Sequence, residues 1–375
     1  MKKLLIYGYC CLLFFFSFFS YLFIDPGLLY LRNFYTGFFS ENRLVVIILY
    51  TLFICLFFLT YYLFIKLVRS EKLPLKQIFL LIVANVSILL FSYPAILSFD
   101  IFNYIATAKV AFFYHENPYI VMPYEFIGDP LLLFMHAANK VALYAPFWTL
   151  LSAIPHLLGF NNFLITLFNL KFFISLFYVA GAFLVWKISK NIYSVVLFAL
   201  NPLIVIETLV SSHNDIVMMF FALCAFFFAF KKKFILALLF LFFSIFIKYA
   251  TIVLLPIFIY MLIKYKSGEK IDQQNIFLIA AFLMFIVFLF SFLREEIYPW
   301  YAIWFLTFIS FLPKKKNLVV LSTALSFGLL LRYVPFMFLG TYFGLTPLIK
   351  VCVTVIPVFI VLAWSLISKY AKKYN

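Results

Sequence analysis

Residues 44–65 read LVVIILYTLFICLFFLTYYLFI, an unbroken apolar run that lies between Arg43 and Lys66. A helix needs about 20 mostly apolar residues to cross the hydrocarbon core of a bilayer. The run is long enough and contains no charged residue. It therefore predicts a transmembrane helix, and similar runs recur along much of the chain.

The composition of the whole chain agrees with this interpretation. Of its 375 residues, 67% are hydrophobic and 11% are charged, and the mean hydropathy is +1.14. Soluble domains are roughly 45–50% apolar and about 25% charged. The composition therefore excludes an ordinary soluble domain, and it also excludes a disordered chain, which needs low hydrophobicity.

The apolar runs predict an all-α, polytopic membrane protein with about twelve transmembrane helices. Three of the predicted spans, beginning at residues 234, 250 and 299, are short. The apolar stretch 146–160 contains two prolines and a glycine, and we interpret it as a re-entrant or interfacial segment. The predicted spans are 4–24, 44–65, 77–98, 163–186, 193–211, 214–230, 234–249, 250–263, 276–293, 299–312, 318–339 and 346–367.

The charges are distributed unevenly between the two predicted sides. The chain holds 29 Lys and Arg against 13 Asp and Glu, for a net charge of +16. With the N-terminus inside, the inner loops and the two chain ends hold 20 of the basic residues and three of the acidic ones. Lys and Arg collect on the cytoplasmic side of membrane proteins. The excess charge therefore predicts cytoplasmic termini in the cell membrane, and it requires no nucleic-acid partner.

The loop lengths predict a single membrane domain, 1–375, with its chemistry on the outer face. The second outer loop runs over about 99–145 and reaches 162 with the broken apolar stretch. A loop of this length is usually functional or disordered. Its many aromatic and aliphatic residues argue against disorder. No small-residue cleavage site follows the first apolar run, so we expect that run to remain as a helix.

Several polar residues lie close to the apolar boundary on the predicted outer side. Ionisable groups there are costly and usually functional. These residues are Asp100, Glu207, His213, Asn214, Asp215, Lys248 and Arg294.

This set suits the transfer of a sugar from a lipid-phosphate donor. A carboxylate can act as general base towards a hydroxyl, and cations can hold a phosphate. We predict that Asp100 deprotonates the acceptor and that the lipid phosphate leaves against Lys248, Arg294 and His213. Ordinary structural roles are the alternative: Asp100 as a helix cap, and the two cations reaching the lipid headgroups.

Five short segments carry a family resemblance. The chain resembles the GT-C superfamily of integral-membrane glycosyltransferases, and within it the polyprenyl-phosphate-mannose-dependent mannosyltransferases of bacteria and archaea. The segments are SFDIFNYIATAKVAFFYHENPYIV (98–121), LYAPFWTLL (143–151), LNPLIVIETLVSSHNDIVMM (200–219), FIKYATIVLLP (246–256) and EIYPWYAIW (296–304).

The resemblance implies a GT-C-like fold, an outer-face site, a polyprenyl-phosphate sugar donor and inversion at the anomeric carbon. The sugar would be a hexose such as mannose, and the acceptor a glycan or glycolipid hydroxyl. Asp100 matches the catalytic acid/base position. Many family members place this acid in the first outer loop, where Asp25 is the rival, but the residues around Asp25 do not match. Substrate-binding roles are expected for Tyr104, Asn117, Tyr119, Tyr144, His213, Asn214, Asp215, Lys248, Arg294, Trp300 and Tyr301.

Two other functions and the question of a metal stay open at this point. A transporter or a flippase for lipid-linked sugars would use the same charges along a substrate path, although no two matched halves with broken helices are visible. A scaffold in envelope assembly would tolerate changes at Asp100 and Asp215. These two carboxylates could share a divalent metal, but no ligand spacing demands one.

Overall fold

The computed structural model describes residues 2–96, 98–293 and 296–374, with the backbone alone from residue 369 onward. Within these residues the chain is 76% helical and has no strand. The α-helices are α1 (Lys2–Ser20), α2 (Phe38–Glu41), α3 (Arg43–Arg69), α4 (Leu75–Leu89), α5 (Asp100–Phe112), α6 (Pro146–Leu157), α7 (Phe163–Ser189), α8 (Ile192–Ala199), α9 (Pro202–Val205), α10 (Asp215–Phe230), α11 (Phe234–Ile245), α12 (Leu255–Lys266), α13 (Gln273–Phe290), α14 (Ala302–Ile309), α15 (Lys316–Leu331), α16 (Val334–Leu339) and α17 (Thr346–Tyr374).

The helices confirm a polytopic membrane protein. Among the described residues, seven helical segments are long and apolar enough to cross a membrane, and α8 with α9 forms an eighth if the bent pair is one span. Four further apolar helical segments, of 10–17 residues, cover 75–89, 215–230, 234–245 and 299–309. Every predicted span thus overlaps a helical segment. The count of twelve is not confirmed, because these four are short for a crossing.

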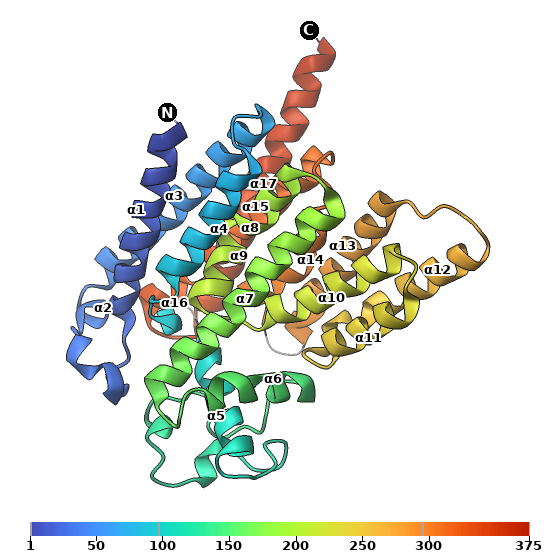
Figure 1. Ribbon diagram of the computed structural model, residues 1–375. Helices are drawn as coiled ribbons and strands as arrows, with labels where there is room; N and C mark the ends of the chain where they lie inside the picture. The colour runs from blue at the N-terminus through green and yellow to red at the C-terminus, as the bar shows by residue number, and fades with distance from the viewer. Residues whose placement is uncertain (1, 97, 294–295, 375) are drawn as a thin grey trace.

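The two ends of the chain lie on the same side of the molecule (Figure 1). The turns between α3 and α4, α7 and α8, and α14 and α15 lie on that side as well, whereas α5 and α6 lie at the opposite end. Those turns carry basic residues. The arrangement fits an even number of crossings, and it separates the basic loops from the long loop 99–162.

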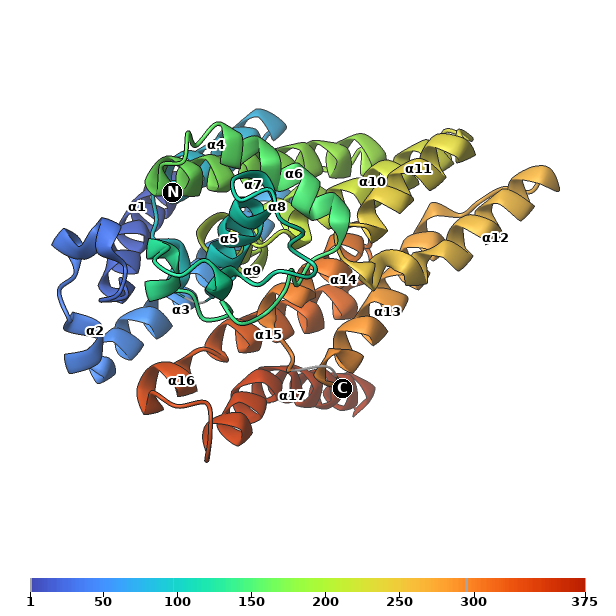
Figure 2. The ribbon, with the colours of Figure 1, turned by 90° about the horizontal axis from the view of Figure 1, so that it is seen from below.

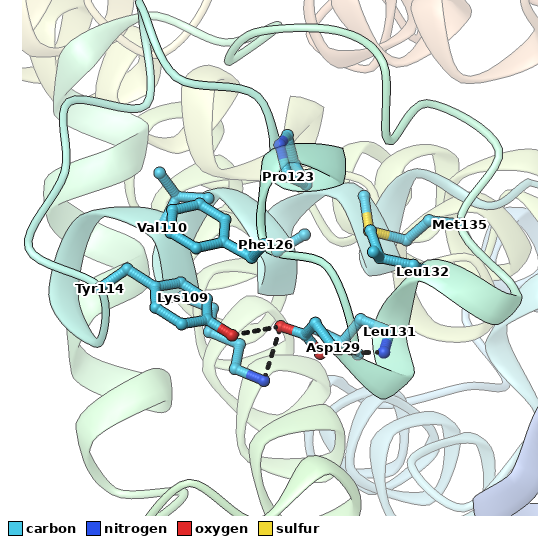
Figure 3. Close-up of a pocket in the computed structure, with 10 residues that line it drawn as sticks. Lys109, Val110, Tyr114, Pro123, Phe126, Asp129, Leu131, Leu132 and Met135 are labelled. Atoms are coloured by element: carbon cyan, nitrogen blue, oxygen red, sulfur yellow. Dashed lines mark hydrogen bonds and ion pairs between the residues drawn. The ribbon is translucent and has the colours of Figure 1, made fainter.

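The loop 99–162 is folded rather than extended. Figure 3 shows Asp129 at the centre of its contacts: the carboxylate lies 2.8 Å from Lys109 Nζ and accepts hydrogen bonds from Tyr114 Oη at 2.9 Å and Leu131 N at 3.0 Å. Burial and the Asp129 carboxylate raise the pKa of Tyr114 to about 12, so the phenol remains a donor at neutral pH. Helix α6, in the stretch 146–160, is 12 residues long and lies crosswise below the bundle (Figure 1).

The Asn201-Pro202 step bends the chain between α8 and α9 by 55°. Proline lacks a backbone donor and cannot continue a helix, but it suits the first turn of a new one. The Asn201 side chain accepts a hydrogen bond from Leu203 N at 3.0 Å and caps α9. A π-helical turn, Ile206–Val210, follows directly. Such turns occur frequently at functional sites, and this one leads into the His213-Asn214-Asp215 turn that begins the buried helix α10.

Helix α10 is central among the helices that follow α7 in the chain. It packs against α7, α11 and α14. Figure 2 shows the same molecule from the α5–α6 end, with α5 in front of the bundle and α12 extending away from it. Hydrogen bonds between Tyr104 and Asn214 join the turn before α10 to the loop 99–162, and the candidate site forms at this junction.

Candidate active site

A cavity of about 1160 Å³ opens where the N-terminus of α5 meets α13, α16 and the segment 298–304. This volume is slightly larger than that of ordinary ligand pockets, which are roughly 300–1000 Å³. One part of its wall is apolar, with Ile286, Val287 and Phe290 from α13. The polar and aromatic residues of the wall include Asp25, Asp100, Asn103, His136, Tyr144, Lys248, Glu296, Tyr298, Trp300, Tyr301, Trp304, Arg332, Tyr333 and Lys350.

Asp100 is the first residue of α5, and its side chain is 23% exposed to the cavity. Its backbone N–H donates to Ser98 Oγ at 3.2 Å. Burial raises the pKa of Asp100, but the interactions with His213 and Lys248 lower it more, and the resulting pKa lies below the usual value. A carboxylate that stays ionised and faces an open cavity has the requirements of a general base.

His213 joins Asp100 to a second carboxylate. Its Nδ1 lies 3.5 Å from Asp100 Oδ2, and its Nε2 lies 3.4 Å from Glu207 Oε2. Tyr333 Oη donates to Glu207 Oε1 at 2.9 Å. Burial lowers the pKa of His213, but the two carboxylates raise it by more than burial lowers it, so the net shift is upward. The imidazole ring stacks on Trp300, with 4.0 Å between the ring centroids, which fixes its orientation.

Asp215 and Lys248 form a buried ion pair behind this array. The fully buried Asp215 accepts hydrogen bonds from Lys248 Nζ at 2.7 Å and from Trp304 Nε1 at 2.6 Å. Lys248 Nζ also lies 5.6 Å and 5.4 Å from the ring centres of Tyr144 and Tyr301. Two separate donors therefore occupy both Asp215 oxygens, one each. No three His, Cys, Asp or Glu side chains group as metal ligands in the described chain.

The sequence-predicted residues fall into three positions. Asp100, Tyr144, Lys248, Trp300 and Tyr301 line the cavity. Four others are buried beside it: Tyr104, His213, Asn214 and Asp215. Two lie in the loop 99–162 away from the lining, Asn117 and Tyr119. Arg294 is outside the described residues.

The residues away from the lining position those that form it. Tyr104 Oη donates to Asn214 Oδ1 and accepts from Asn214 N, both at 3.3 Å, which ties α5 to the turn before α10. Tyr119 Oη donates to the backbone oxygen of Tyr144 at 2.9 Å. Asn117 Oδ1 accepts from Tyr119 N at 3.0 Å. These contacts hold the segments that carry Asp100 and Tyr144.

Asp25, which the sequence offered as the rival of Asp100, lines the same cavity. Four other lining residues were not predicted as site residues: Glu296, Arg332, Tyr333 and Lys350. The available signal was the presence of Arg332 and Lys350 inside otherwise apolar runs. Ionisable residues in such runs usually face a protein interior or a cavity. Tyr333 and Trp304 gave no signal, because aromatic residues are common throughout this chain.

Comparison with known proteins supplies the family. Neither the curated proteins nor the solved structures contain a match to the chain. A family model described as alpha-(1->6)-mannopyranosyltransferase, N-terminal domain, of the MptA_B family, matches residues 26–264. The matched part contains Asp100, Glu207, His213 and Lys248. Since this match covers more than half of the chain, the protein belongs to the alpha-(1->6)-mannopyranosyltransferase (MptA_B) family and is a mannose-transferring, integral-membrane glycosyltransferase.

Proposed function

We propose that the protein transfers mannose from a polyprenyl-phosphate donor to a hydroxyl of a glycan or glycolipid at the outer face of the cell membrane. The observation that carries the proposal is the array Asp100–His213–Glu207, whose one exposed member opens on the large cavity. Its ionised carboxylate supplies a base, and the apolar wall from α13 supplies a surface for a lipid chain. The short basic loops at the opposite end support the orientation.

In the proposed reaction Asp100 accepts the proton of the acceptor hydroxyl. The acceptor oxygen attacks the anomeric carbon, while the bond from that carbon to the phosphate oxygen breaks and its electron pair stays with the lipid phosphate. Attack opposite to the leaving group inverts the configuration. The sugar carries oxocarbenium character as the bond breaks, as in other glycosyl chemistry.

His213 and Lys248 support the base. Their positive charge stabilises the ionised form of Asp100 over the protonated form, so the carboxylate is ready at neutral pH. Glu207 holds the far side of the imidazole and Trp300 holds its face. In the proposal the buried residues His213 and Glu207 position Asp100 and do not contact the sugar.

The test compares Asp100→Asn with Asp25→Asn, because both carboxylates line the cavity. Purified protein in detergent is supplied with labelled polyprenyl-phosphate mannose and an acceptor glycolipid, with chelator present or absent. General-base catalysis contributes about 10²- to 10⁴-fold. We expect Asp100→Asn to lose a factor in this range and Asp25→Asn to lose less.

Three results would contradict parts of the proposal. Full activity of Asp100→Asn with loss in Asp25→Asn would move the base to the first loop. Full activity of both variants would exclude a carboxylate base from this cavity. No product from wild-type protein, combined with uptake of the donor into proteoliposomes, would favour a transporter of lipid-linked sugars.

A further inference from the structure

Three ionisable residues form a second charged group in the cavity, outside the matched residues 26–264. Lys350 Nζ lies 3.0 Å and 3.3 Å from the two carboxylate oxygens of Glu296, and Arg332 Nη2 lies 3.6 Å from Glu296 Oε2. Lys350 Nζ also lies 5.1 Å from the centre of the Tyr342 ring. We call Glu296, Arg332 and Lys350 the cationic cluster. All three residues line the cavity.

The cationic cluster has more positive charge than its carboxylate balances. Two cations share one Glu296 side chain, and their own side chains are only 9% and 7% exposed. Arg332 Nε is buried and has no hydrogen-bond partner among the described residues. A buried charge without full compensation is strongly unfavourable. An anion in the cavity would supply the missing charge and acceptors.

Residue positions connect the cationic cluster to the proposed chemistry. Arg332 directly precedes Tyr333, which donates to Glu207 of the Asp100–His213–Glu207 array. The two residues between α15 and α16 therefore reach both groups. The apolar residues Ile286 and Val287 line the same cavity and offer a surface for an acyl or prenyl chain. The anion that suits all these features carries a phosphate on an apolar chain.

We propose that Arg332 and Lys350 bind the phosphate of the lipid-linked sugar donor. The inference rests on the proposed function and assigns its leaving-group site. The donor phosphodiester carries one negative charge, and the lipid phosphomonoester that leaves carries between one and two at neutral pH. Fixed cations at the place where charge develops stabilise a transition state. The cationic cluster thus faces the oxygen that receives the electron pair of the broken bond.

The test measures binding without any sugar transfer. The full chain in detergent is titrated with farnesyl phosphate, farnesol, inorganic phosphate or phosphatidylglycerol, and binding is followed by calorimetry and by the shift in Tm. We expect wild-type protein to bind farnesyl phosphate more tightly than the other three. Hydrogen bonds to charged groups contribute about 1.5–3 kcal/mol, so Arg332→Gln and Lys350→Gln should each weaken binding about tenfold or more.

Two further variants separate this site from a purely structural ion cluster. Glu296→Gln removes the competing carboxylate, so farnesyl phosphate should bind it at least as tightly as wild-type protein and should raise its Tm more. Lys314→Gln removes a positive charge from an exposed loop away from the cavity, and its affinity should not change. If Arg332→Gln does not fold, Lys350→Gln and Glu296→Gln still give opposite expected shifts.

The inference is overturned if Arg332→Gln and Lys350→Gln bind farnesyl phosphate like wild-type protein, or if Glu296→Gln weakens binding as they do. Equal affinity for inorganic phosphate or phosphatidylglycerol would overturn the lipid-donor assignment. The result is independent of the base. Active Asp100→Asn protein would remove the proposed base and leave an Arg332-dependent phosphate site in place.

Discussion

Asp100 and His213 are 113 positions apart in the chain, yet their side chains lie 3.5 Å from each other. The sequence predicted both residues as parts of one site, because both lie at apolar boundaries. It did not predict that His213 would also meet Glu207. That contact depends on the π-helical turn before His213, which sets the direction of both side chains.

Replacement of His213 should shift the pH dependence of transfer. The pKa of Asp100 lies below its usual value, so its ionised form is favoured in the folded protein. The resulting stability is present above the unfolded pKa and is lost as the pH falls through the lowered pKa. His213→Gln removes the main interaction that lowers this pKa and leaves burial, which raises it. The acid limb of the kcat/KM profile should therefore move to higher pH.

The measurement is transfer rate against pH for wild-type protein and His213→Gln. The pKa of His213 is raised, so the folded protein also favours its protonated form. The resulting contribution to folding stability is present at acid pH and is lost as the pH rises through the raised pKa. Wild-type protein should thus also lose part of its folding stability as the pH rises through this pKa. An unchanged acid limb in His213→Gln would show that His213 does not act through Asp100.

At the level of elements, α15 and α17 approach each other closely at Gly328. A Cβ atom built at this position would lie 2.3 Å from the backbone oxygen of Thr354. Backbone atoms cannot move aside as a flexible side chain can. Gly328 therefore allows α17, which is otherwise little buried, to pack on α15 and hold Lys350 beside Arg332.

We expect Gly328→Ala to destabilise the protein by about 1–3 kcal/mol, the typical cost of overpacking. The measurement is the unfolding midpoint in detergent. Gly8→Ala in α1 is the matched control, because a Cβ there meets nothing within 4 Å. Alanine favours a helix over glycine at both positions. A midpoint for Gly328→Ala at or above that of Gly8→Ala would contradict the close helix contact.

At the level of the whole molecule, the basic loops and the loop 99–162 lie at opposite ends (Figure 1). Under the positive-inside rule, the cavity end should face the outside of the cell. Ile127, which is 96% exposed, and Lys314, which is also exposed, mark the two ends. This pair allows the orientation to be tested directly.

The orientation test uses Ile127→Cys and Lys314→Cys in a chain whose five native cysteines are replaced by serine or alanine. Intact cells are treated with a membrane-impermeant maleimide. We expect label on Ile127→Cys in intact cells, and on Lys314→Cys only after the membrane is opened. The reverse pattern would place the cavity on the cytoplasmic side.

The predicted helical membrane fold is confirmed, whereas the number of crossings stays a prediction. Apolar length and the distribution of Lys and Arg indicate helices and their direction, because both depend on local composition and on the bilayer. Helices of intermediate length such as α10 and α11 are ambiguous. Whether a short apolar helix crosses the bilayer depends on the helices packed around it, which composition does not describe.

The sequence by itself determined a helical membrane protein with a basic face, and it indicated Asp100, His213 and Lys248 as site residues. The tertiary structure decided which charges pair: Lys248 with Asp215, His213 between two carboxylates, and two cations on Glu296. The physical reason is that hydropathy and ion pairing act over different ranges. Hydropathy acts over about 20 neighbouring residues, whereas ion pairs form over a few ångströms between segments that only folding brings together.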